Sequence, residues 1–149
     1  MEDFDISGLL PEYDSFIDGL DMFIRICVIV GPLILLGRGL YYLLAAPKEA
    51  NHSAGYRFRY GMAKARSWRF MQFIAGLVYS VVGLLMAIVM IILCVTLHQL
   101  SLMDMAVEAV RLILWQAGII LVATLGINIT VVVFFDSEGN RRKDFKTLK

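Results

Sequence analysis

The chain has 149 residues, of which 59% are hydrophobic and 18% are charged, and its mean hydropathy is +0.73. A water-soluble domain of this length is normally much less apolar, so the composition argues against a soluble globular protein and favours a membrane protein. The formal net charge of +1 conceals a strong segregation, because seven acidic residues precede the first basic residue, Arg25.

The first segment, residues 1–21, is acidic and leads into the stretch GLLPEYDSFIDGLDMF. In it, Phe16, Ile17 and Leu20 stand at helical spacing between aspartates, which is typical of a helix lying along the outer membrane interface. A disordered acidic lead-in is the alternative. We expect no cleaved signal peptide, because acids stand where a signal peptide has basic residues.

Three apolar stretches are long enough to cross the hydrocarbon core, which takes about 20 residues. They are residues 22–46, 70–97 and 112–135, and the second and third contain no charged residue. Pro47 ends the first stretch, because proline lacks a backbone N–H and does not fit a helix interior. The sequence therefore predicts an all-α fold, a three-helix transmembrane bundle.

The connections between these stretches differ in their basic residues. The loop 47–69 has six lysines and arginines and the tail 136–149 has five, whereas the turn 98–111 has only Arg111. An excess of Lys and Arg marks the cytoplasmic side of a membrane protein. We therefore expect the N-terminus outside and the C-terminus inside, with the basic loop against anionic lipid headgroups of the inner leaflet.

Arg38 lies inside the first span, roughly 12 Å from its inner end. A centred arginine costs at least about 2.5 kcal/mol, so intramembrane arginines are functional candidates by default. Its side chain could reach the inner headgroups beside Gly37 and Gly39, bind a ligand, or pack against a polar partner. The candidate partners on the second span are Gln72, Tyr79 and Ser80.

Small residues on the second and third spans suit close helix packing, either within the bundle or against another subunit. They are Gly76, Ser80 and Gly83 on the second span, and Gly118, Ala123 and Gly126 on the third. Cys27 and Cys94 fall at similar depth, so a disulfide is geometrically conceivable, although buried cysteines commonly act as small hydrophobes.

The loop and the tail carry two ordered motifs. The loop contains Pro47, Asn51 and then GYRFRYGMAKARSW at 55–68, and the tail begins with FDSEGNRRK at 135–143. This order resembles the SdpI family of small bacterial membrane proteins. There a proline, an asparagine, a Gly-Tyr-Arg-Thr run and a Ser-Met precede a tryptophan, and many members end in Phe-Asp-x-x-Gly-Asn. The resemblance covers about a third of the chain.

Four residues depart from the family pattern. Phe58 stands where the family usually has threonine, Gly61 where serine is common, and Arg66-Ser67 replaces a polar or acidic pair. The resemblance implies a protein of the bacterial plasma membrane that gives immunity to, or senses, a secreted membrane-active peptide. It also implies a soluble regulator as a partner, with signalling through the cytoplasmic loop.

Physical reasoning assigns roles to the same motif residues. Gly55 permits a positive φ where the chain turns. Arg57 could fork onto a phosphate or a carbonyl cluster, and Trp68 could anchor the next helix in the headgroup zone. A folded hairpin cap without a ligand is the alternative. The candidate binding or signalling residues are Arg38, Asn51, Gly55, Tyr56, Arg57, Met62, Lys64 and Trp68.

No motif predicts catalysis: the chain has no GxSxG, no HExxH and no phosphate-binding glycine loop. His52 and His98 should fall on opposite sides of the membrane, so they cannot share a metal ion within one subunit. We expect no enzyme, no cofactor or metal, and no direct contact with nucleic acid. The alternative function is a small subunit of an oligomeric transporter, channel or other membrane complex, with Arg38 lining a shared pathway.

Overall fold

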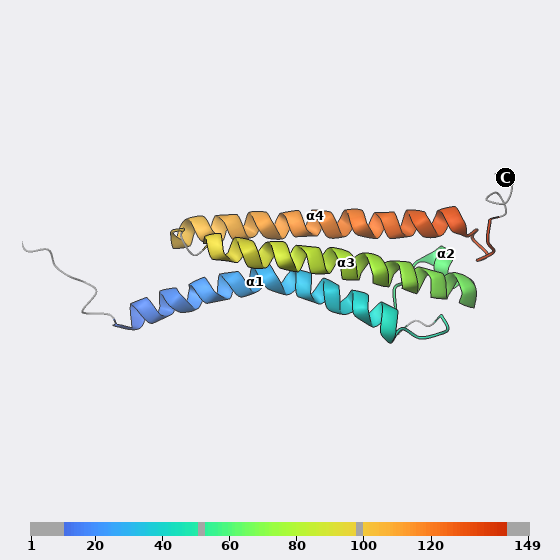
Figure 1. The fold of residues 1–149 in the computed structure, drawn as a ribbon, viewed down its shortest axis with the longest axis horizontal. Helices are drawn as coiled ribbons and strands as arrows, with labels where there is room; N and C mark the ends of the chain where they lie inside the picture. Colours follow the sequence, from blue (N-terminus) through green and yellow to red (C-terminus); the bar gives the residue numbers. More distant parts are fainter. Residues whose placement is uncertain (1–10, 51–52, 98–99, 143–149) are drawn as a thin grey trace, which may run out of the picture.

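The computed structural model describes residues 11–50, 53–97 and 100–142. Its helices, in chain order, are α1 (Pro11–Leu44), the single turn α2 (Arg59–Met62), α3 (Ala65–Leu97) and α4 (Leu102–Phe134). The three long helices lie side by side in alternating directions (Figure 1). We call the end that holds residues 53–64 and 135–142 the loop end, and the opposite end, where α3 passes to α4, the turn end.

The three long helices are each long and apolar enough to cross a membrane, in agreement with the number of spans that the sequence predicts. They contain 34, 33 and 33 residues. At about 1.5 Å per residue each is about 50 Å long, whereas the hydrocarbon core is about 30 Å thick. The helices therefore cross at a tilt or extend beyond the hydrocarbon.

The start of α4 is set by a capping residue rather than by the start of the apolar stretch. The helix begins at Leu102, so most of the predicted turn 98–111 is helical. The Ser101 hydroxyl accepts a hydrogen bond from the backbone N–H of Asp104 at 3.3 Å and donates to the Asp104 carboxylate at 2.6 Å. This is an N-cap, and the acid in the first turn favours the same helix end.

The acidic segment and the first span belong to one helix from Pro11 onward. The structure shows no break near residue 22, where the sequence suggests a boundary between an interfacial helix and a span. Asp21 and Arg25 form an ion pair across this boundary, one helical turn apart. Such a pair supports a continuous helix. Residues 1–10 lie outside the described part of the chain.

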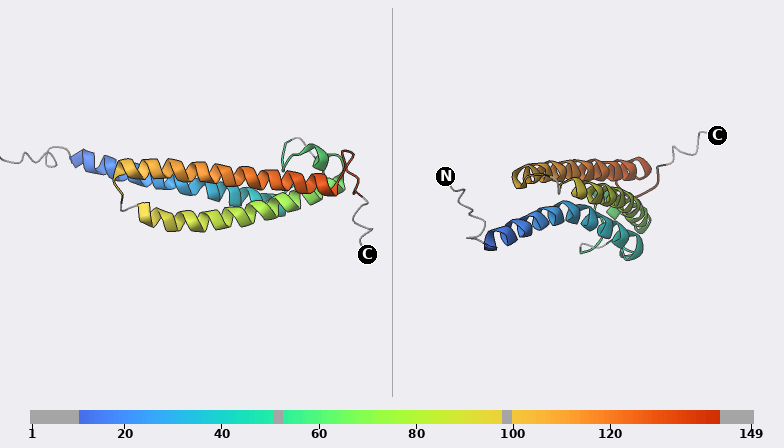
Figure 2. Two further views of the ribbon diagram at one scale, coloured as in Figure 1. Left: turned by 90° about the horizontal axis from the view of Figure 1, so that it is seen from above. Right: turned by 60° about the vertical axis from the view of Figure 1, so that its left-hand side comes forward.

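Helix α1 bends near its middle, as Figure 1 and, from other sides, Figure 2 show. Pro32 lies inside the helix and has no N–H to donate to the carbonyl of Val28. The side chain of Gln116 on α4 supplies the missing bond, with its Nε2 donating to the Val28 oxygen at 2.9 Å. Gly31 leaves room for this amide, because a Cβ there would lie 2.6 Å from the Gln116 Oε1. A helix-breaking residue in α1 is thus compensated by a polar residue in α4.

Helices α1 and α3 pack through glycines. A Cβ on Gly39 would overlap the backbone nitrogen of Ser80, and a Cβ on Gly83 would lie 2.6 Å from the backbone nitrogen of Leu36. Gly76 is equally close to Leu43 of α1. The predicted small surface of the second span is therefore a seam within the bundle.

The small residues of α4 behave differently. Nothing lies within 4 Å of a Cβ built on Gly118 or Gly126, so these glycines do not form a seam in the single chain. Ala123 is partly buried and packs against the core at the loop end. Only one of the three small residues named on this helix therefore contributes to the core.

The buried side chains form two clusters, one toward each end of the bundle. The loop-end cluster contains Trp68, Met71 and three tyrosines, and the turn-end cluster contains Cys94. Cys27 and Cys94 are both free cysteines, so the conceivable disulfide does not form.

Candidate functional site

The loop before α3 is held against that helix through hydrogen bonds to the loop backbone. Gly55 has a φ of +99°, as its type predicts, and a Cβ there would lie 2.8 Å from the Trp68 ring. The buried Gln72 amide makes two bonds to the next residue: its Oε1 accepts from the Tyr56 N–H at 2.8 Å and its Nε2 donates to the Tyr56 carbonyl at 2.7 Å. Gln72 therefore satisfies both backbone groups of Tyr56, as a neighbouring strand would.

Trp68 is fully buried beneath this loop. Its indole N–H donates to the carbonyl of Pro47 at 2.7 Å. The ring therefore closes the loop from inside and does not face the headgroup zone, as an interfacial anchor would. The sequence suggests a headgroup anchor at Trp68, and the structure instead buries its ring inside the chain.

Tyr56 extends from the loop into the bundle and reaches α4. Its hydroxyl donates to the Asn128 side-chain oxygen at 2.7 Å, and its ring packs against those of Tyr42 and Tyr79 with centroids 6.1 and 5.9 Å away. The Tyr79 hydroxyl pairs in turn with Thr124 of α4 at 2.8 Å. Burial is the main cause that raises the pKa of Tyr56 well above its usual range, so the phenol keeps the proton that it donates.

Arg38 does not pair with any of the partners that the sequence suggests. Its Nη2 donates to the hydroxyl of Tyr42, one turn further along α1, at 2.9 Å. It also lines a cavity of about 540 Å³ whose walls include Tyr41 and Gly55. Arg57, from the loop, lines the same cavity. The fold thus brings together two arginines that lie 19 residues apart.

The two motif stretches meet at the loop end. The Asp136 carboxylate accepts backbone bonds from Glu138 and Asn140 at 3.0 and 2.7 Å, which closes a tight turn. A Cβ on Gly139, whose φ is +75°, would lie 3.0 Å from the backbone nitrogen of Lys64. The Lys64 ammonium donates to the Asn140 side-chain oxygen. The bond from the Asn140 backbone is the main cause that lowers the pKa of Asp136.

Two departures from the family pattern have structural roles in this chain. Gly61 is buried against Met71, so a serine there would collide with that side chain. Ser67 is fully buried, and its hydroxyl lies within hydrogen-bonding distance of the Gly61 carbonyl at 3.1 Å and the Lys64 carbonyl at 2.9 Å. The Ser67 hydroxyl therefore connects α3 to the segment that contains Gly61 and Lys64.

The remaining predicted site residues are distributed as follows. Met62 is partly buried and packs against the loop-end core, and Asn51 lies outside the described residues, as do His52 and His98. Sequence reasoning missed Asn128 and Gln116, which tie α4 to the loop and to α1. The signal that would find them is a polar side chain inside an otherwise apolar span.

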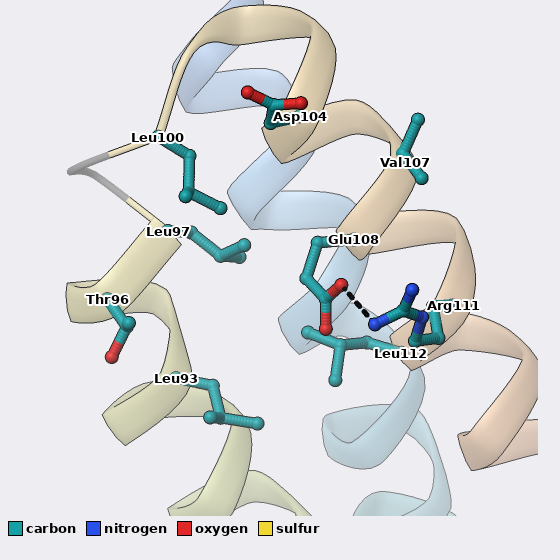
Figure 3. A pocket seen from close by; sticks show the side chains of 9 residues that line it. All are labelled: Leu93, Thr96, Leu97, Leu100, Asp104, Val107, Glu108, Arg111 and Leu112. Carbon is teal, nitrogen blue, oxygen red and sulfur yellow. Dashed lines mark ion pairs between the residues drawn. The ribbon is translucent and has the colours of Figure 1, made fainter.

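A second cavity, of about 460 Å³, lies at the turn end between α3 and α4 (Figure 3). Its walls combine leucines from both helices with the polar side chains of Asp104, Glu108 and Arg111. Arg111 pairs with Glu108 at 3.0 Å, as their spacing on the helix predicts. The cavity is therefore apolar inside, with two carboxylates and one base on its walls.

Comparison with protein family models, with curated proteins and with solved structures finds no match for this chain. The resemblance to the SdpI family therefore rests on the residues of the two motif stretches.

Proposed function

We propose that this chain is an SdpI-like multi-pass protein of the bacterial plasma membrane that gives immunity to, or senses, a membrane-active peptide and signals through its basic loop. The observation that carries the proposal is the contact between the two motif stretches. Lys64 bonds to Asn140, 76 positions later, and Gly139 lies against the same segment. Two stretches that share one function would be expected to form one surface.

The proposed orientation places the N-terminus outside and the loop end in the cytoplasm. It is supported by the position of the basic loop and the described part of the basic tail at the same end of the bundle (Figure 1). Both segments then meet the same leaflet, as the excess of Lys and Arg requires.

In this orientation the turn-end cavity faces the side from which a secreted peptide arrives. Its leucines and the Asp104 carboxylate, which forms no ion pair among the described residues, suit a cationic amphipathic peptide. The loop at the other end responds because it is bonded to both α3 and α4, through Gln72 and through Asn128. A peptide that moves α4 relative to α3 therefore moves Tyr56 and the loop.

The test is survival of a peptide-sensitive bacterial host that expresses the chain, measured against a panel of membrane-active peptides. We compare Arg57→Ala with Arg66→Ala, because both remove one exposed base at the loop end, and Arg57 lines the cavity that contains Arg38 whereas Arg66 is not among its lining residues. Protection by wild type and by Arg66→Ala, with loss in Arg57→Ala at equal membrane levels, is the expected result. Trp68→Ala is a poor probe, because it would empty the centre of the loop.

Absence of protection by wild type against every peptide would contradict this function. It would favour the alternative, a small subunit of a membrane complex. One observation supports that alternative: α4 leaves Gly118 and Gly126 uncovered, where another subunit could pack. A discrete oligomer or hetero-complex in mild detergent would then be expected, and a strict monomer would count against it.

A further inference from the structure

The cavity lined by Arg38 and Arg57 has two basic residues and no acidic one among the described residues of its walls. Arg38 comes from α1 and Arg57 from the loop, so two residues of like charge line one cavity of about 540 Å³. Among the described residues, no carboxylate forms an ion pair with either arginine. The partner that the structure gives Arg38 is the Tyr42 hydroxyl, which accepts a hydrogen bond from it and is not a carboxylate. Two basic side chains that line one cavity without a carboxylate among its described lining residues favour an anion as its ligand.

The arginines are held by different means, and both are kept near the cavity. Arg38 is positioned by its bond to Tyr42 and by its Cζ lying 5.9 Å from the centroid of that ring. Arg57 directly follows Tyr56, whose N–H and C=O are both bonded to Gln72. A guanidinium presents parallel N–H donors that match phosphate oxygens, and holding the backbone reduces the entropy lost on binding.

The depth and the remaining walls of the cavity distinguish a lipid from a soluble anion. Arg38 lies six residues before the end of α1, or about 9 Å along the helix axis, near the depth of lipid headgroups. Ile34 and Gly37 also line the cavity: Gly37 directly precedes Arg38, and Ile34 lies one turn deeper in α1 with 58% of its surface exposed. An acyl chain can pack against this apolar side of α1, whereas a free phosphate would make no favourable contact with it.

We propose that this cavity binds the phosphate group of an anionic phospholipid, with Arg38 and Arg57 donating to its oxygens and an acyl chain running along Ile34. The site couples the lipid to the loop, because Arg57 is part of the loop and Arg38 is part of α1. The proposal requires the chain to lie in a membrane and does not depend on the peptide function.

The test is native mass spectrometry of the purified full-length chain in detergent, titrated with phosphatidylglycerol or phosphatidylcholine. We expect wild type to prefer phosphatidylglycerol, and Arg38→Gln and Arg57→Gln each to weaken its binding about tenfold, the loss of one charge-assisted contact. Arg66→Gln is the matched control, because it removes an exposed base at the same end outside the cavity, and its affinity should stay within about twofold of wild type.

Equal weakening in all three variants would overturn the site, since it would indicate diffuse attraction to the basic surface. Equal binding of the two lipids by wild type would also overturn it. Arg59→Gln adds a further check, because Arg57 and Arg59 line a neighbouring hollow of about 600 Å³. A loss in Arg57→Gln and Arg59→Gln without one in Arg38→Gln would move the anion there and overturn the proposal.

A competition arm separates the two sources of phosphate. Glycerol 3-phosphate and inorganic phosphate are added at the concentration of lipid that half-saturates wild type. We expect no displacement of phosphatidylglycerol, and displacement would overturn the lipid assignment. Folding of each variant is checked by its helicity and its melting temperature in detergent. A loss of binding in Arg57→Gln is not explained by misfolding, because the Arg57 side chain makes no hydrogen bond within the described structure that the substitution would remove.

Discussion

The two interfaces of α1 are built on different principles. Against α3, the helix packs backbone to backbone through Gly39, Gly76 and Gly83. Against α4, its described polar contact is a hydrogen bond from Gln116 to the carbonyl that Pro32 leaves without an in-helix donor. One interface depends on the absence of side chains and the other on the presence of a particular side chain.

The difference reflects the solvent. Lipid tails are as apolar as leucine, so helices in a membrane gain little by burying apolar surface against each other. Close packing between small residues and hydrogen bonds between helices are the two means that remain. The α1–α3 pair uses the first means, and α4 is attached through the second, at Gln116, Thr124 and Asn128.

The largest effect should come from filling the α1–α3 seam. In Gly39→Leu, the new side chain starts where it overlaps the backbone of Ser80 and lies 2.8 Å from the carbonyl carbon of Tyr79. Backbone cannot move aside as a flexible side chain can, so we expect a loss at or above the usual cost of overpacking, about 1–3 kcal/mol. Unfolding of the purified protein in mixed micelles, followed by helicity, measures it.

Gly118→Leu is the matched control for this prediction. It makes the same change on α4, where nothing lies within 4 Å of the new Cβ, and leucine is a better helix former than glycine by up to about 1 kcal/mol. We expect wild-type stability or slightly more. Equal destabilisation by the two leucines would show that the glycine seam is not what distinguishes the interfaces.

An intermediate effect should follow the loss of the bond from Gln116. Gln116→Leu leaves the Val28 carbonyl without its donor and should cost between about 0.6 and 1.7 kcal/mol, the average and the maximum measured for hydrogen bonds between membrane helices. Pro32→Ala returns an N–H to α1 that can bond to the same carbonyl. In that background Gln116→Leu should therefore cost less, and a double-mutant cycle on unfolding free energies measures the coupling.

Strict additivity of the two substitutions would contradict this account. It would mean that Gln116 stabilises α4 by filling space beside Gly31 rather than by replacing the bond that proline removes. The comparison between the two interfaces would then reduce to packing in both cases.

The smallest effect concerns the tail, which is attached to the loop mainly by polar contacts. The pKa of Asp136 is lowered, chiefly by the N–H of Asn140. A lowered folded-state pKa contributes stability that is present above the ordinary aspartate pKa of about 3.9 and is lost as pH falls through the lowered value. Amide exchange at Glu138 and Asn140 should therefore lose protection in acid, and Asp136→Asn should remove this pH dependence. Unchanged protection across the acid range would show that the carboxylate does not hold the turn.

Much of the candidate site could be predicted from local chemistry. The positive φ of Gly55 follows from its residue type, and the importance of Arg38 follows from the cost of a charge in an apolar span. The surroundings of Trp68 could not be predicted, because an indole near a membrane boundary can face either headgroups or protein, and Pro47 decides between them only once the loop is folded. That Arg38 and Arg57 line the same cavity could not be predicted either, because it depends on where the loop turns.

The three helices long and apolar enough to span a membrane are predictable from the chain alone, because length and hydropathy are properties of each segment. The basic connections are equally visible there. How those helices are joined appears only in the folded chain: which glycines form a seam, which carbonyl Gln116 bonds, and which base lines a cavity with Arg38. These outcomes depend on the relative rotation of neighbouring helices, and in a chain with so few polar residues that rotation is set by a small number of close contacts between distant positions.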